Sequence, residues 1–134
     1  MANAIYPKYK EALISGGSNV NLSSGTVKVA LVDTGTYTYS SAHDYYDDVS
    51  AAVVGTPQTL ASKTVTSGTF DAADVTYTAV SGSSVEALVI YVDSGAAATS
   101  PLVAYIDTSV TGLPVTPNGG DISIVWNASG IFTL

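Results

Sequence analysis

The sequence has 134 residues with no cysteine, and its four lysines and eleven acidic residues give a formal net charge of −7. The absence of cysteine excludes a thiol nucleophile, thiolate metal ligands and disulfide bonds. Nucleic-acid binding depends on basic side chains that neutralise phosphates, so we expect no DNA or RNA partner for so acidic a chain.

The length is typical of one domain, and we predict that residues 1–134 form a single one. No stretch approaches the about 18 consecutive apolar residues of a membrane span. Residues 1–8 lack the apolar core of a signal peptide. We therefore expect a protein that is made and used without crossing a membrane and that has no membrane partner.

Residues 3–16 carry the one helical pattern near the N-terminus. Pro7 suits the first turn of a helix, and Gly16-Gly17 supplies a stop. The apolar residues that could share one face are Ile5, Tyr9, Ala12 and Leu13. Because so short a helix is not stable alone in water, we expect residues 1–17 to form a helical arm that packs on the domain or on a partner.

The rest of the chain is rich in Val, Thr and Tyr and poor in helix-forming residues, which favours β-strands. Residues 85–92 and 101–106 are apolar on both faces and predict central strands that are covered on both sides. Residues 41–49 predict a short helical turn. The predicted strands in chain order are 26–32, 51–54, 58–66, 75–80, 85–92, 101–106, 122–126 and 131–134.

About eight short strands separated by turn signals, without long intervening helices, predict an all-β fold. The architecture that fits best is an antiparallel β-sandwich, jelly-roll-like, with the short N-terminal helix added to it. The last two strands flank Ser129-Gly130 and are predicted to pair as a hairpin.

His43 is the only histidine, and three aspartates follow it within residues 44–48. A His–Asp pair could act as a general base, but the sequence contains neither a Gly-x-Ser-x-Gly motif nor a cysteine nucleophile. The same aspartates, or Asp71 with Asp74, could bind Ca²⁺, but they lack the spacing of an EF-hand loop, and turn and helix-capping roles account for them. We predict no catalytic residue, no metal site and no cofactor.

Glu86 is the only acidic residue within the apolar segment 85–92. A hydrolase with two catalytic carboxylates would need a second one across a cleft, which the sequence does not reveal. We expect a strand-end glutamate that faces solvent or pairs with Lys28.

Six tyrosines lie outside the strongest predicted strands. Aromatic side chains with a polar tip are enriched at protein interfaces, and they also cover the open ends of β-sandwiches, so both interpretations stay open. The residues predicted to contact neighbouring subunits are Ile5, Tyr6, Tyr9, Tyr37, Tyr39, Tyr45 and Tyr46.

Three stretches of the sequence resemble a family of small virion proteins of tailed bacteriophages. The first runs from Val27-Lys28-Val29-Ala30-Leu31-Val32-Asp33 through Tyr37 and includes His43-Asp44 and Asp47-Asp48-Val49. The second is Ser84-Val85-Glu86-Ala87-Leu88-Val89-Ile90-Tyr91, and the third is Gly112-Leu113-Pro114-Val115-Thr116-Pro117-Asn118-Gly119-Gly120-Asp121. The similarity spans nearly the whole chain.

The resemblance implies a structural virion protein, and small β-sandwich proteins of such particles commonly serve as capsid decoration, or cement, proteins. On that analogy the partner is the phage major capsid protein. The location is the outer capsid surface after synthesis in the bacterial cytoplasm, and the chain forms a homodimer or homotrimer there. Two other hypotheses stay open: a tail, neck or baseplate component, and a carbohydrate-binding sandwich that uses Trp126 and exposed tyrosines as stacking platforms.

Overall fold

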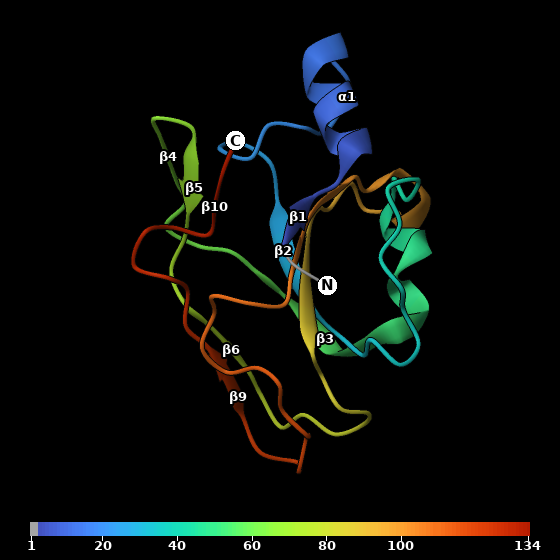
Figure 1. Cartoon of the computed structure of the whole chain (residues 1–134), viewed down its shortest axis with the longest axis vertical. Coiled ribbons are helices and arrows are strands. Elements are labelled where there is room, and N and C mark those ends of the chain that lie inside the picture. The colour runs from blue at the N-terminus through green and yellow to red at the C-terminus, as the bar shows by residue number, and fades with distance from the viewer. Residues whose placement is uncertain (1–2) are drawn as a thin grey trace.

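The computed structural model describes residues 3–134 (Figure 1). These residues form mostly antiparallel β-sheet together with one short α-helix, α1 (Pro7–Ser15), which confirms the predicted all-β, sandwich-like fold. Short 3-10 turns span Tyr46–Asp48, Ser50–Ala52 and Ala97–Thr99. Within residues 3–134, no helix is long and apolar enough to span a bilayer.

The main layer is a five-stranded sheet in which every pair of neighbours is antiparallel. In spatial order its strands are β1 (Ala4–Ile5), β8 (Leu102–Ile106), β7 (Ala87–Val92), β2 (Val27–Val32) and β3 (Val53–Thr59). Every residue of β7 and β8 is buried, as their doubly apolar sequences predict.

Two smaller sheets cover one face of the main layer, and the 3-10 turns cover the other (Figure 1). One small sheet contains β10 (Phe132–Thr133), β5 (Thr69–Asp71) and β4 (Thr64–Thr66), and the other contains β6 (Val75–Tyr77) and β9 (Ile122–Ile124). Both β6 and β9 alternate buried and exposed residues, so each has one inward face. The Tyr77 hydroxyl donates to the Val29 carbonyl at 2.7 Å and ties the two layers together.

The N-terminal segment belongs to the core. Ala4 and Ile5 pair with β8, and the Tyr6 N–H donates to the Val103 carbonyl at 3.0 Å. The helix therefore begins at Pro7, later than the predicted start at residue 3, and it ends where Gly16 adopts φ +70°. Of the two predicted positions for this arm, packing on the domain is the one observed.

Three local predictions are wrong. Strands β9 and β10 do not form a hairpin, because β9 pairs with β6 and β10 pairs with β5. The predicted strand 58–66 is split between β3 and β4, with a positive φ of 53° at Ser62 between them. The helical turn predicted for 41–49 begins only at Tyr46 and is 3-10 in geometry.

Candidate functional site

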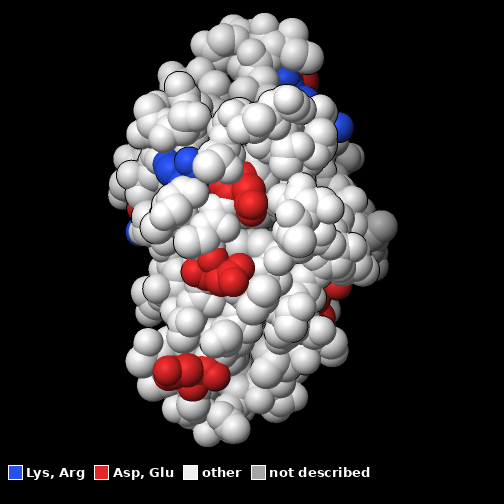
Figure 2. Space-filling view, turned by 90° about the vertical axis from the view of Figure 1, so that its left-hand side faces the viewer, with Lys and Arg blue, Asp and Glu red and all other residues white. Residues whose placement is uncertain are grey.

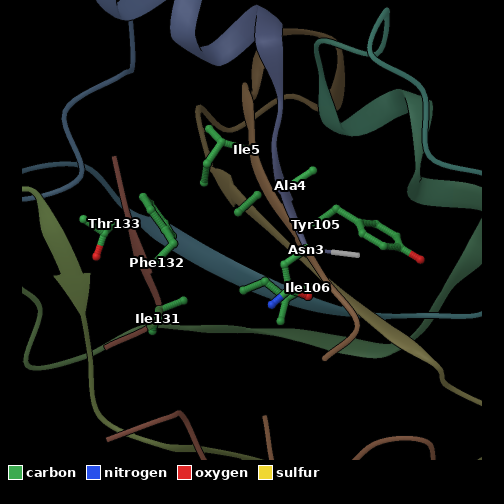
Figure 3. Close-up of a pocket in the computed structure, with 9 residues that line it drawn as sticks. Asn3, Ala4, Ile5, Tyr105, Ile106, Ile131, Phe132 and Thr133 are labelled. Carbon is green, nitrogen blue, oxygen red and sulfur yellow. The ribbon is translucent and has the colours of Figure 1, made fainter. Parts of the chain in front are cut away.

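Four tyrosines gather on the face of the main sheet that carries the 3-10 turns. Tyr105 of β8 points away from the two small sheets (Figure 3). Its ring centre lies 5.6 Å from that of Tyr39 and 6.4 Å from that of Tyr37, and the rings of Tyr39 and Tyr6 are 5.1 Å apart. We call Tyr6, Tyr37, Tyr39 and Tyr105 the tyrosine cluster. Such spacings are typical of favourable tilted aromatic pairs.

A chain of hydrogen bonds runs through the tyrosine cluster to the only histidine. The hydroxyls of Tyr6 and Tyr37 lie 2.8 Å apart, and the Tyr37 hydroxyl lies 2.8 Å from His43 Nδ1. Burial raises the pKa of Tyr37 to about 12 and raises the pKa of Tyr6 further above its ordinary value. Both phenols are therefore protonated at neutral pH, and hydrogen bonds join their hydroxyls within the cluster.

The loop that carries Tyr37 and His43 is fastened at both ends. At its start, Asp33 Oδ1 accepts the Gly35 N–H, and Glu86 Oε1 accepts the Thr34 N–H at 2.9 Å. At its end, the Tyr46 N–H donates to the Ser100 carbonyl at 2.9 Å. Hydrogen bonds to Ser84 and Thr34 lower the pKa of Glu86, so its carboxylate is charged at neutral pH.

A hollow of about 480 Å³ lies beside the tyrosine cluster. Aromatic rings, threonine hydroxyls and two carboxylates line it: Thr34, Tyr37, Thr38, Tyr39, Glu86, Tyr105, Asp107, Thr108 and Pro114. The charges of Asp107 and Glu86 both contribute to a raised pKa of Tyr105, after the larger effect of burial. This combination of ring edges and hydrogen-bonding groups suits contact with a protein surface.

Two of the aspartates discussed as calcium ligands accept hydrogen bonds from the backbone. Asp48 Oδ2 accepts the N–H of Asp44 at 2.9 Å, and Asp74 Oδ1 accepts the N–H of Trp126 at 2.9 Å. Partial burial, followed by the charge of Asp48, raises the pKa of Asp44. In the part of the chain that the structure describes, no three His, Cys, Asp or Glu side chains converge as metal ligands would.

The predicted interface residues differ widely in exposure. The side chains of Tyr6, Tyr9 and Tyr37 are almost fully buried in the chain's own core, although Tyr9 and Tyr37 also line hollows, and their contact with a partner stays a prediction. The other members are half-buried or exposed, and their contact with a partner stays a prediction: Ile5, Tyr39, Tyr45 and Tyr46. Tyr46 stacks on Tyr91 with ring centres 4.1 Å apart, which uses one of its faces.

Two further expectations are corrected by the geometry. Lys28 pairs with Asp93 at 2.9 Å, and Glu86 accepts hydrogen bonds from Thr34 in place of that lysine. Trp126 is buried, and its Nε1–H donates to the Ala73 carbonyl at 3.1 Å. It is therefore a core residue and not a stacking platform for a sugar.

A second hollow, of about 250 Å³, lies where the edge strands β1 and β10 face each other across the open side of the sandwich (Figure 3). Ile5, Ile106 and Phe132 give it apolar walls. Asn3 lies at its rim, where Oδ1 accepts the Asp107 N–H at 2.7 Å and Nδ2 donates to the Thr108 carbonyl at 2.9 Å. The side-chain amide of Asn3 therefore holds the N-terminal segment against the residues that follow β8.

The sequence interpretation missed a group of exposed apolar side chains near α1. Ile14, Val65 and Leu134 lie in different segments of the sequence, and each is well exposed. The signal in the sequence was Val65, an apolar residue between two threonines. In the structure all three residues of this strand, 64–66, are exposed. Only the fold shows that these segments share one end of the molecule (Figure 1).

A scan of the chain against protein-family models finds no match, and a search of curated proteins finds no relative.

Proposed function

We propose that the chain is a non-enzymatic structural protein of a tailed-bacteriophage virion, and specifically a capsid decoration protein. It binds the outer surface of the major capsid protein as a dimer or trimer and bridges neighbouring capsomers. A protein that binds the assembled shell but not free subunits shifts the equilibrium toward assembly. Because the contact repeats over the lattice, each single contact can be modest.

The observation that carries the proposal is the sequence resemblance, and the all-β, sandwich-like fold is compatible with it. The first of its three stretches contains β2 and the second contains most of β7, which are neighbouring strands of the main sheet. The third, residues 112–121, leads into β9 and is held by a pairing of Val115 with Val85. The resemblance therefore lies in segments that build an all-β fold of a kind used in virions.

Gly112, the first residue of the third stretch, occupies a position that only glycine fits. Its φ is +118°, and a Cβ atom placed there would lie 2.5 Å from the Ser123 carbonyl oxygen. A side chain is therefore excluded at the start of the stretch. Further along, Asp121 Oδ1 accepts the Ala79 N–H at 3.0 Å, and the Val80 N–H donates to the Gly120 carbonyl at 2.9 Å.

The test is the copy number of the chain in purified particles of the phage that encodes it, measured by quantitative mass spectrometry. Hundreds of copies per particle, with matching density on the outer capsid surface in a cryo-electron reconstruction, are expected. About a dozen copies or fewer would indicate the tail, neck or baseplate position instead, where rings of low symmetry recur. Absence of the chain from particles would overturn the virion assignment.

A further inference from the structure

The end of the molecule that carries α1 exposes four large apolar side chains from three segments. Ile14 is 88% exposed, Leu134 59%, Val65 54% and Leu13 37%. Figure 1 shows α1, the β4–β5 hairpin and the last residues of the chain at this same end. Within residues 3–134, the other large apolar side chains that are comparably exposed are Tyr45 and Val125.

Three of these side chains open onto one groove of about 250 Å³ between α1 and the β4–β5 hairpin. We call it the α1 groove. Its main lining residues are Tyr9, Leu13, Leu22, Val65, Phe70 and Leu134. Tyr9 and Phe70 are buried beneath it, so its floor belongs to the core and is held in place. The groove is a preformed apolar depression with exposed apolar rims.

These exposed groups contribute little to the fold of the single chain. Ile14 has almost no contact with the rest of the molecule, and all three residues of β4 are exposed. The strand β4 is also an edge of its sheet, with one neighbour only. Exposed apolar surface beside an exposed strand edge promotes association, so it marks a contact surface when it is contiguous.

The charge of this end differs from that of the rest of the chain. The groove lining itself carries no charged side chain, but the segments that contribute to it, 7–15, 20–23, 63–71 and 130–134, hold three of the four lysines and two of the eleven acidic residues. The remainder holds one lysine and nine acidic residues. The charged side chains of the groove segments are Lys8, Lys10, Glu11, Lys63 and Asp71. In Figure 2 the lysines lie toward the α1 end, whereas acidic groups extend toward the opposite end.

We propose that the α1 groove is the surface through which the chain attaches to its partner, and that the partner is an acidic protein surface that inserts an apolar side chain between Leu13 and Val65. This inference rests on the proposed function, in which that surface belongs to the assembled shell. The lysines favour an acidic partner by charge complementarity. The apolar rims supply the contact area that is covered on binding.

The experiment uses shells of the phage that lack the chain because its gene is deleted, mixed with purified protein and sedimented. Wild-type protein should co-sediment with the shells in a saturable manner. Val65→Asp should weaken binding at least tenfold, because it places a carboxylate in an apolar contact against an acidic surface, and Val65→Ser should weaken it by a smaller factor. Val125→Asp is the matched control, since Val125 is 42% exposed and lies outside the groove.

Salt dependence tests the charge argument. Raising the ionic strength from about 50 to 500 mM should weaken binding of the wild type several-fold, because salt screens exposed charges. Lys10→Glu should weaken binding at low salt and reduce the dependence on salt. Wild-type binding that does not change with salt would overturn the acidic character of the partner.

Three outcomes decide the inference. If wild-type protein fails to bind shells, the proposed function fails and this inference fails with it. If the wild type binds and Val65→Asp binds equally well, the α1 groove is not the attachment surface, while the proposed function stands. If sedimentation velocity shows a wild-type oligomer that Val65→Asp dissociates, the occupant is a second copy of the chain, and the acidic shell partner is overturned.

Discussion

The tyrosine cluster and the α1 groove are both rich in large side chains, yet they differ in how these side chains are covered. In the tyrosine cluster, rings pack on rings, and the buried hydroxyls of Tyr6 and Tyr37 bond to each other. In the α1 groove, Leu13, Val65 and Leu134 line an open depression. The first region is covered mainly by the chain itself, with a hollow open at its side, and the second leaves exposed apolar rims for another molecule to cover.

This difference shows that residue type alone does not identify an interface. A tyrosine is amphipathic and serves a core as well as a contact surface, provided that its hydroxyl finds a partner. Tyr9 makes the same point, since its hydroxyl donates to the Val20 carbonyl at 2.7 Å while its ring lies beneath the α1 groove. Exposure after folding, and not composition, separates the two regions.

The largest effect is expected when the same substitution is placed in a central strand and at the rim of the α1 groove. Val89 is fully buried at the centre of β7, and Val89→Asp should prevent soluble folding. An unpaired buried carboxylate costs several kcal/mol against a total stability of about 5–15 kcal/mol. Val65→Asp, at an exposed position, should fold as the wild type does. Circular dichroism of the soluble fraction checks both, and a folded Val89→Asp would contradict the central position of β7.

The next effect concerns the hydrogen bonds of the tyrosine cluster. Tyr37→Phe removes the group that links Tyr6 to His43 and leaves the buried Tyr6 hydroxyl without its partner. The loss should be about 1–3 kcal/mol of unfolding free energy, measured by urea denaturation. Tyr45→Phe is the control, because Tyr45 is exposed and its change should be close to zero. Equal stability of the two variants would show that the cluster contributes by ring packing alone.

The central strands of the sheet were predictable because their sequences carry a strong and local signal. Residues 87–92 are apolar at every position, and only a strand covered on both faces suits that composition. The pairing of β10 was not predictable in this way. Ile131 donates its N–H to the Phe70 carbonyl, which is a contact across 61 residues that no local turn signal contains.

The candidate surfaces were predictable only in part, for a similar reason. The tyrosine-rich segment 37–46 was found from composition, but its burial depends on Tyr105 and Tyr6 from distant parts of the chain. The α1 groove needs four separate segments to meet at one end, so no single stretch predicts it. Sequence patterns report which residues alternate or cluster, and they do not report which surfaces remain uncovered.

A smaller effect should follow acidification, through the carboxylate that fastens the loop of the tyrosine cluster. The pKa of Glu86 is lowered from an ordinary value of 4.5, first by its hydrogen bond with Ser84 and also by Thr34. Glu86 therefore stabilises the fold above pH 4.5, and this contribution is lost as the pH falls through its lowered pKa. Because the group is partly exposed, the loss should be about 1 kcal/mol or less.

Glu86→Gln should reduce the dependence of the unfolding free energy on pH below 4.5, as measured by urea denaturation at several pH values. Glu11→Gln, on the exposed face of α1, is the control. Glu11 forms an ion pair with Lys8 at 2.8 Å in which both side chains are largely exposed, and such pairs contribute little. An equal change in the pH dependence of both variants would mean that Glu86 contributes no more to stability than the exposed Glu11.

The smallest effect on stability is expected at Ile14, on α1 beside the α1 groove. Ile14 is 88% exposed, so Ile14→Ser removes little buried area and should change the unfolding free energy by less than about 0.5 kcal/mol. The same substitution should lower the binding of a hydrophobic dye to the folded protein, since the exposed apolar surface becomes smaller. Val125→Ser removes a comparable exposed side chain away from the groove and should leave dye binding nearly unchanged, because a single scattered apolar residue gives the dye no contiguous surface. If Ile14→Ser instead lowers stability by more than 1 kcal/mol, Ile14 contributes to folding in solution, and the apolar surface at the α1 end is not free for a partner to cover.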